Sequence, residues 1–237
     1  MDNQRFLLVI LNSFKEFLAS GTSRSTAKLK PLHGAIARDL AARLPEYTIK
    51  SQGYNDGKEG IIPGRYIDKK VDIVILKGSR VVAGIAVKFV MQNYSQNSNN
   101  YFENMLGETA NIRSNGIPYF QIFIVLDKLP YYEKNTKKTI KKWEDLKEHH
   151  LKKYVTLSND PIDNRRFLHS PDRTLLFVIH LPENEKLQTW EDYKNFYYSK
   201  KLTISSKTFP NFGSLVILND WSKFAEKIYH TVKLNEL

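Results

Sequence analysis

The stretch KVDIVILKGSRVVAGIAVKF, residues 70–89, carries the pattern from which the fold can be predicted. Its two halves, 70–77 and 80–89, are rich in β-branched residues and flank a short turn that contains a glycine, which is typical of a β-hairpin. In such a hairpin the beginning of one strand lies beside the end of the other, and side chains alternate between the two faces. Asp72 and Lys88 are therefore expected at the same end of the hairpin. There a carboxylate suited to a hard metal ion lies next to an ammonium group.

The segments around the hairpin predict helices and one buried strand. Apolar residues recur at helical spacing in residues 1–20 and again in residues 32–44. After the hairpin, residues 102–113 predict a helix that stops at Gly116, and residues 119–126 form an almost uninterrupted apolar strand. A helix between two strands allows them to lie parallel. We therefore expect an α/β fold with a mixed central sheet flanked by helices.

The C-terminal part of the chain has a weaker pattern. Residues 131–153 are highly charged and are expected to form a helix. Residues 175–179 and 215–218 indicate short strands, and residues 221–232 indicate a closing amphipathic helix.

Composition narrows the possible partners. Lys plus Arg exceed Asp plus Glu by 36 − 25 = 11, so a polyanion would be attracted, and nucleic acid is the first candidate. A soluble protein with a basic surface is the alternative. The absence of cysteine excludes disulfides and Cys-ligated zinc and leaves metals with oxygen ligands. No stretch reaches the roughly 18 apolar residues that span a bilayer, so we expect a cytoplasmic protein that does not enter the membrane.

Two short motifs of the hairpin carry a family resemblance. VD at residues 71–72 and IAVK at residues 85–88 resemble the signature of the PD-(D/E)xK nuclease superfamily. In that signature an acid opens one strand, and an acid, any residue and a lysine close the next. Many type II restriction endonucleases share this core, whose order of elements matches residues 30–126. The resemblance implies that Asp72 binds Mg²⁺, which activates water and neutralises the phosphate, and that Lys88 orients or deprotonates the nucleophile.

The chain departs from this signature at two positions. Val71 stands in place of the proline, and Ala86 stands in place of the second acid, where a methyl group cannot bind a metal. Either residue 86 is an inactivating substitution or another acid completes the site. The helix after the hairpin offers Glu103 and Glu108, which stand about 140° apart on it, so only one is expected to face the metal. Glu103 ranks first because it is nearer to the hairpin, and Glu59, in a glycine-rich loop, ranks last.

Polar and basic side chains around the expected site are candidates for contacts with DNA. The amide-rich and hydroxyl-rich segment 92–100 follows the hairpin, and such side chains bind base edges or phosphate oxygens, with a helix-capping loop as the alternative. The candidate DNA-binding residues are Arg65, Lys69, Lys70, Asn93, Ser95, Gln96, Asn97, Asn99 and Asn100. The basic connection of residues 22–30 is a further candidate for binding phosphates, with a solvated loop as the alternative. The six histidines show no zinc-ligand spacing and receive no role.

These patterns lead to one functional hypothesis and two alternatives. We expect a single nuclease domain over residues 1–237, with a catalytic core at about 30–130 and a part, 131–237, that binds DNA or mediates dimerisation. The leading hypothesis is a homodimeric type II restriction endonuclease that cleaves specific double-stranded DNA with Mg²⁺. The alternatives are a non-catalytic nucleic-acid-binding protein with a degenerate nuclease fold, and a repair or mobile-element nuclease of the same fold.

Overall fold

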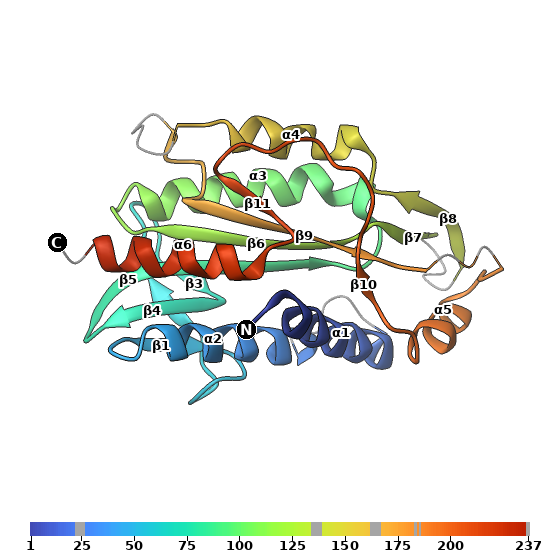
Figure 1. Ribbon diagram of the computed structural model, residues 1–237, viewed down its shortest axis with the longest axis horizontal. Coiled ribbons are helices and arrows are strands. Elements are labelled where there is room, and N and C mark those ends of the chain that lie inside the picture. Colours follow the sequence, from blue (N-terminus) through green and yellow to red (C-terminus); the bar gives the residue numbers. More distant parts are fainter. Residues whose placement is uncertain (22–26, 134–138, 162–166, 183, 185, 236–237) are drawn as a thin grey trace.

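A mixed sheet runs through the centre of the protein, and helices cover both of its faces (Figure 1). The computed structural model describes residues 1–21, 27–133, 139–161, 167–182, 184 and 186–235. Within these residues the central sheet has seven strands, in the order β1-β4-β5-β6-β9-β10, and β11 also pairs with β9. The prediction of an α/β fold with a mixed central sheet flanked by helices is confirmed.

The helices and strands have the following bounds. The described helices are α1 (Asn3–Ser20), α2 (Lys30–Arg43), α3 (Tyr94–Arg113), α4 (Glu148–Ser158), α5 (Trp190–Tyr197), α6 (Trp221–Leu234) and the short 3₁₀ helix η1 (Ala27–Leu29). The described strands are β1 (Thr48–Ser51), β2 (Gly60–Ile62), β3 (Lys69–Val71), β4 (Ile73–Lys77), β5 (Arg80–Val90), β6 (Tyr119–Leu126), β7 (Lys128–Tyr132), β8 (Ile140–Asp145), β9 (Arg173–His180), β10 (Thr203–Ile204) and β11 (Val216–Leu218). None of these helices has the length and apolar character that crossing a membrane requires.

The predicted hairpin and the predicted buried strand form the middle of the sheet. β4 and β5 are antiparallel, with Ile73 opposite Ile85 and Lys77 opposite Arg80. β6 lies parallel to β5, and α3 connects them. All residues of β6 are buried, because the strand has a parallel neighbour on each side and helices on both faces.

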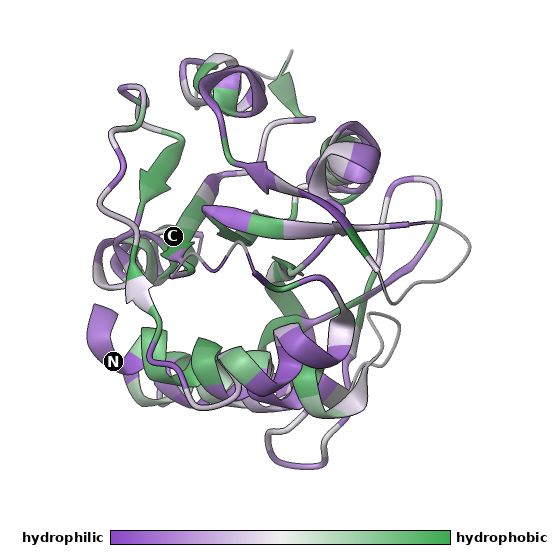
Figure 2. Cartoon of the chain, turned by 90° about the vertical axis from the view of Figure 1, so that its right-hand side faces the viewer, coloured by the Kyte–Doolittle hydropathy of each residue, from purple (hydrophilic) through white to green (hydrophobic). Residues whose placement is uncertain are grey.

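Aromatic side chains fill the space between the sheet and the helices. On one face, the ring of Phe6 in α1 lies 4.9 Å from that of Phe177 in β9 and 4.7 Å from that of Trp221 in α6. On the other face, Phe123 in β6 lies 5.4 Å from Tyr154 in α4. The helices carry both hydrophilic and hydrophobic residues (Figure 2), as expected when one side of a helix packs on a core.

The prediction of one helix over residues 131–153 is wrong. The described part of this range contains the end of β7, all of β8 and the beginning of α4, which starts at Glu148; residues 134–138 lie outside the described chain. β7 and β8 form a separate antiparallel pair in which Pro130 lies opposite Trp143. The pairing of these two strands, which are close in sequence, outweighs the helical tendency of the lysines of β8.

Two further differences concern the segments that flank the hairpin. α3 begins at Tyr94, so most of the amide-rich segment 92–100 forms its first turns instead of a loop. The expected strand 70–77 is interrupted at Asp72. The residues before it pair with β2 in a two-stranded sheet, with Ile61 opposite Lys70, whereas β4 enters the central sheet. Asp72 therefore lies at a bend between two sheets.

Candidate functional site

The bend at Asp72 is held by a hydrogen bond to the neighbouring strand. The backbone N–H of Val87 donates to Oδ2 of Asp72 over 2.7 Å. Burial raises the pKa of Asp72 to about 6, against this hydrogen bond, and the charges of Glu59 and Glu108 raise it further while Lys88 lowers it. The carboxylate of Asp72 thus lies among other acids, in a position where a cation would stabilise its charged form.

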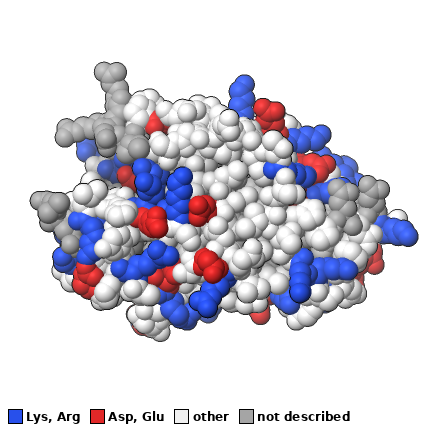
Figure 3. Space-filling model, viewed as in Figure 1, with Lys and Arg blue, Asp and Glu red and all other residues white. Residues whose placement is uncertain are grey.

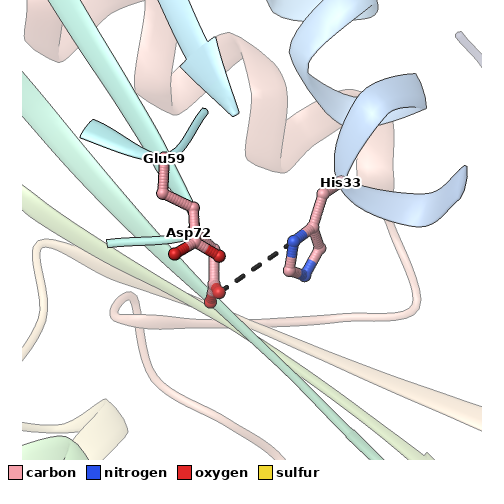
Figure 4. Close-up of side chains that lie close together, drawn as sticks. All are labelled: His33, Glu59 and Asp72. Atoms are coloured by element: carbon pink, nitrogen blue, oxygen red, sulfur yellow. Dashed lines mark ion pairs between the residues drawn. The ribbon is translucent and has the colours of Figure 1, made fainter. Parts of the chain in front are cut away.

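Three side chains with metal-ligating atoms converge at this bend. His33 comes from α2, Glu59 from the residue before β2, and Asp72 from the bend, and one ligand atom of each lies within 4.8 Å of the others. Figure 4 shows the imidazole of His33 turned toward the carboxylate of Asp72, with Nδ1 3.9 Å from Oδ1. An imidazole nitrogen and two carboxylates form a donor set that fits a divalent cation.

His33 is buried without the hydrogen bonds that a core histidine normally makes. It is 3% exposed, and within the part of the chain that the structure describes neither ring nitrogen has a hydrogen-bond partner. Burial lowers the pKa of His33 to about 4, so the imidazole is neutral at pH 7 and keeps a lone pair to donate. A buried polar group without a partner is uncommon in native proteins, which supports a ligand at this position.

A close contact between two glycines sets the position of His33. α2 passes the turn after β1 so closely that a Cβ at Gly34 would lie 2.2 Å from the carbonyl oxygen of Gly53. Gly53 has a φ of 77°, which side-chain-bearing residues rarely adopt. Because His33 directly precedes Gly34, this contact holds its imidazole near the end of the hairpin.

A cavity of about 300 Å³ opens beside these residues. Its lining includes Asp72, Ala86, Lys88, Tyr101, Glu108 and Gln121. The ammonium nitrogen of Lys88 lies 4.2 Å from the centre of the Tyr101 ring, and burial lowers the pKa of Lys88 while the charge of Asp72 opposes that shift. The structure thus places Asp72 and Lys88 at one cavity, as the hairpin pattern predicts. The methyl group of Ala86 forms part of the same wall.

The candidate second acids differ in their distance from the site, and Glu103, which the sequence ranks first, does not line the described cavity. Glu108 lines the cavity, accepts a hydrogen bond from the hydroxyl of Tyr119, and has its Oε2 3.6 Å from Nζ of Lys69. Glu103 is exposed, does not line the described cavity, and interacts instead with the charge of Lys153. The two glutamates do lie on different sides of α3, as their spacing predicts, but the packing of α3 turns Glu108 inward. Glu59, the last-ranked candidate, lies beside Asp72.

The basic candidates Arg65, Lys69 and Lys70 lie on or next to the small β2–β3 sheet. Lys70 lines the cavity, with its Nζ 3.5 Å from Oε2 of Glu59. Arg65 lies beside the ring of Tyr66, which is 79% exposed. Lys69, through Glu108, and Lys70 thus lie at the candidate site, where they can meet an incoming anion, whereas Arg65 does not line the described cavity.

Two polar residues at the beginning of α3 bind other parts of the protein. The backbone N–H of Ser95 donates to the buried carboxylate of Glu144 over 3.3 Å, and the Ser95 hydroxyl donates to the same carboxylate. The side-chain oxygen of Asn93 accepts a hydrogen bond from the backbone of Tyr132 over 2.8 Å. Both contacts fix the end of α3 to the β7–β8 pair.

The other amides of this segment differ in their surroundings. The side-chain oxygen of Asn99 accepts from Nζ of Lys153 over 3.2 Å. Gln96 and Asn100 are exposed. Asn97 lines a second, smaller cavity next to the first. Segment 92–100 therefore contributes structural contacts as well as side chains that remain accessible.

Charged residues are not gathered into a single basic face in the view of Figure 3. Lys and Arg side chains lie over several parts of this surface and alternate with Asp and Glu. On this face, basic and acidic side chains are interspersed, as they are in the sequence.

Histidine 33 is the site residue that the sequence did not predict. The sequence does place His33 among Leu32, Ile36 and Leu40, which form the buried side of α2, and this could have indicated that its imidazole is buried. A histidine in such a position is more often part of a core than a ligand.

Comparisons with protein-family models, with curated proteins and with solved structures found no match for this chain.

Proposed function

We propose that this chain is a metal-dependent endonuclease that cleaves specific double-stranded DNA with Mg²⁺, as a homodimeric type II restriction endonuclease. The observation that supports it most is the convergence of His33, Glu59 and Asp72, whose ligand atoms lie within 4.8 Å of one another, beside the cavity of Lys88. A carboxylate cluster and a lysine at one cavity are the groups that phosphodiester hydrolysis requires.

The residues at the bend fit a divalent cation. Two carboxylates supply the oxygen ligands that Mg²⁺ prefers, and the unpartnered imidazole of His33 supplies a nitrogen, which Mn²⁺ accepts more readily. When bound, such an ion neutralises charge on the phosphate and activates water. Glu59 and His33 would thereby replace the acid that the resemblance places at Ala86.

The remaining side chains of the cavity would act on the phosphate and the nucleophile. Lys88 directs its ammonium into the cavity, where it can hold a phosphate oxygen, and its lowered pKa eases the exchange of a proton with water. Glu108 is held by Tyr119 and Lys69, so its carboxylate is oriented before substrate binds. Lys70, which lines the cavity, and Arg65, which lies after β2, would contact the DNA backbone.

Ala86 favours a second candidate, a non-catalytic protein that binds nucleic acid. Its methyl group lines the cavity at the position where the resembled family has an acid. The two candidates differ in metal-dependent cleavage. A third reading, a repair or mobile-element nuclease, differs in its preference for branched or nicked DNA.

The test is a cleavage assay with plasmid, short-duplex, nicked and branched DNA in Mg²⁺ or Mn²⁺. We expect the wild type to cut duplex DNA at defined sequences, and Asp72→Asn and Lys88→Met to lose at least about 100-fold in rate, the range for loss of one electrostatic group. The matched pair on α3 is Glu108→Gln, which should slow cleavage, and Glu103→Gln, which should not. DNA binding without cleavage in either metal would overturn the proposal in favour of the binding protein.

A further inference from the structure

A second cavity adjoins the first one and has a different charge. It has a volume of about 170 Å³ and shares Lys88 and Tyr101 with the larger cavity. Its polar lining consists of Lys28, Lys88, Gln92, Asn93 and Asn97. The larger cavity thus contains the acids Asp72 and Glu108, whereas the smaller one brings two lysines and three amides together.

Lys28 is an unusual member of this lining because it is almost completely buried. It is 6% exposed and lies just before α2, with its ammonium nitrogen 5.4 Å from the ring of Phe17. Burial and the nearby charge of Lys88 lower the pKa of Lys28 to about 8. Two ammonium groups that face one small cavity repel each other, and an anion between them would turn this repulsion into attraction.

The size of the second cavity suits a single phosphate group. Its volume of about 170 Å³ leaves room for a group of this size. The amide groups of Gln92 and Asn97 supply further donors at the same wall. Carboxylates would repel a phosphate, and the described lining of this cavity contains none.

The two cavities lie along one side of α3. Three residues at helical spacing on α3 connect them. Asn97 lines the smaller cavity, Tyr101 lines both, and Glu108 lines the larger one. At about 1.5 Å per residue, Asn97 and Glu108 are roughly 16 Å apart along the helix, so the two cavities lie one after the other beside α3.

We propose that the second cavity binds the backbone phosphate next to the cleaved one on the same DNA strand, with Lys28 on its far side and the ammonium group of Lys88, which lines both cavities, between the two phosphates. That the phosphate belongs to DNA rests on the proposed function. That the cavity binds an anion is inferred from its shape and its two lysines. Bound there, the phosphate would fix the register of the strand, so that the cleaved bond lies beside Asp72 and Glu59.

The test measures DNA affinity in Ca²⁺ by fluorescence anisotropy, with DNA that carries one uncharged methylphosphonate at successive positions. For the wild type, we expect one position near the cleaved bond to weaken binding about tenfold, as for the loss of one charge-assisted contact. In Lys28→Met the same position should have no further effect, and the slope of log affinity against log salt should fall by about one.

Controls separate a lost contact from a general loss of structure. Lys28→Arg keeps the charge and should keep the position-specific effect. Lys200→Met is the matched control, because Lys200 also lies over an aromatic ring, 4.6 Å from that of Phe196, but outside both cavities, and it should behave as wild type. Equal sensitivity of wild type and Lys28→Met at all positions would overturn the inference. The same holds if inorganic phosphate binds with Lys28-dependent affinity but no methylphosphonate position stands out.

The outcome can be read separately from that of the proposed function. If the wild type cleaves DNA and Lys28→Met matches it in affinity and salt dependence, the phosphate site fails and the endonuclease stands. If the wild type binds DNA with the position-specific effect but never cleaves, the phosphate site stands and the endonuclease fails.

Discussion

Replacing Asp72 with asparagine should stabilise the protein when no metal is present. The amide keeps the size of the side chain and an oxygen that can accept the 2.7 Å hydrogen bond from Val87, but it removes a charge that is buried among Glu59 and Glu108. The perturbation therefore isolates the electrostatic cost of an ionised carboxylate at the candidate metal site.

The magnitude follows from the shift in pKa. Asp72 has a pKa of about 6 in the folded protein against 3.8 as the ordinary value, so its ionisation favours unfolding. The stabilising contribution of the protonated Asp72 side chain is fully present below pH 3.8 and is lost as the pH rises through 6. A difference of about two pH units corresponds to roughly 3 kcal/mol. Because the side chain is 28% exposed, solvent screening reduces this, and we expect about 1–2 kcal/mol.

The assay is thermal and urea unfolding in EDTA, followed by circular dichroism. At about pH 7.5 we expect the melting temperature of Asp72→Asn to exceed that of wild type by roughly 2–8 °C, and near pH 4 the difference should almost vanish. Saturating Mn²⁺ should stabilise the wild type and leave the variant unchanged. A variant that is less stable than wild type in EDTA at neutral pH, or a difference independent of pH, would refute the reasoning.

Three further predictions concern the same site. Calorimetry should show that Mn²⁺ binds more tightly than Mg²⁺ and that His33→Ala narrows the difference, because an imidazole suits Mn²⁺ better; tighter Mg²⁺ binding would contradict this. Ala86→Glu, which adds a carboxylate to the cavity wall, should strengthen metal binding about tenfold and destabilise the metal-free protein by about 1–2 kcal/mol; unchanged metal affinity would count against it. Gly34→Ala should destabilise the protein by at least about 2 kcal/mol, because its Cβ would meet the oxygen of Gly53 at 2.2 Å. Its matched control is Gly107→Ala in α3, where a Cβ meets nothing within 4 Å. There the free energy of unfolding should increase by roughly 0.5–1 kcal/mol.

The parts of the fold that the sequence predicted are those with local patterns. The β4–β5 hairpin follows from a turn between two β-branched runs, and β6 follows from an uninterrupted apolar run that only a doubly covered strand can bury. Asp72 and Lys88 could be placed together because a hairpin brings its two ends into contact over a short stretch of chain. These contacts depend on neighbours in sequence, so one sequence is enough to predict them.

The parts that could not be predicted depend on contacts between distant segments. Asp72 lies at a bend because β3 pairs with β2, and His33 reaches the site because Gly34 packs against Gly53. The spacing of Glu103 and Glu108 showed that one of them faces away, but which one depends on how α3 packs on the sheet. The β7–β8 pair is different, because its strands are neighbours in the chain; here the many charged residues of β8 resemble a solvated helix, and the sequence does not show that they pair with β7.

The binding of one divalent cation by His33, Glu59 and Asp72 is the claim on which the proposed endonuclease depends. The most direct measurement is anomalous X-ray diffraction from crystals of the wild type soaked in Mn²⁺, with Asp72→Asn crystals as the control. We predict one strong manganese peak between the three side chains in the wild type, within about 2.3 Å of their ligand atoms, and none there in the variant. No peak at this position in the wild type, or an equal peak in both proteins, would contradict the account.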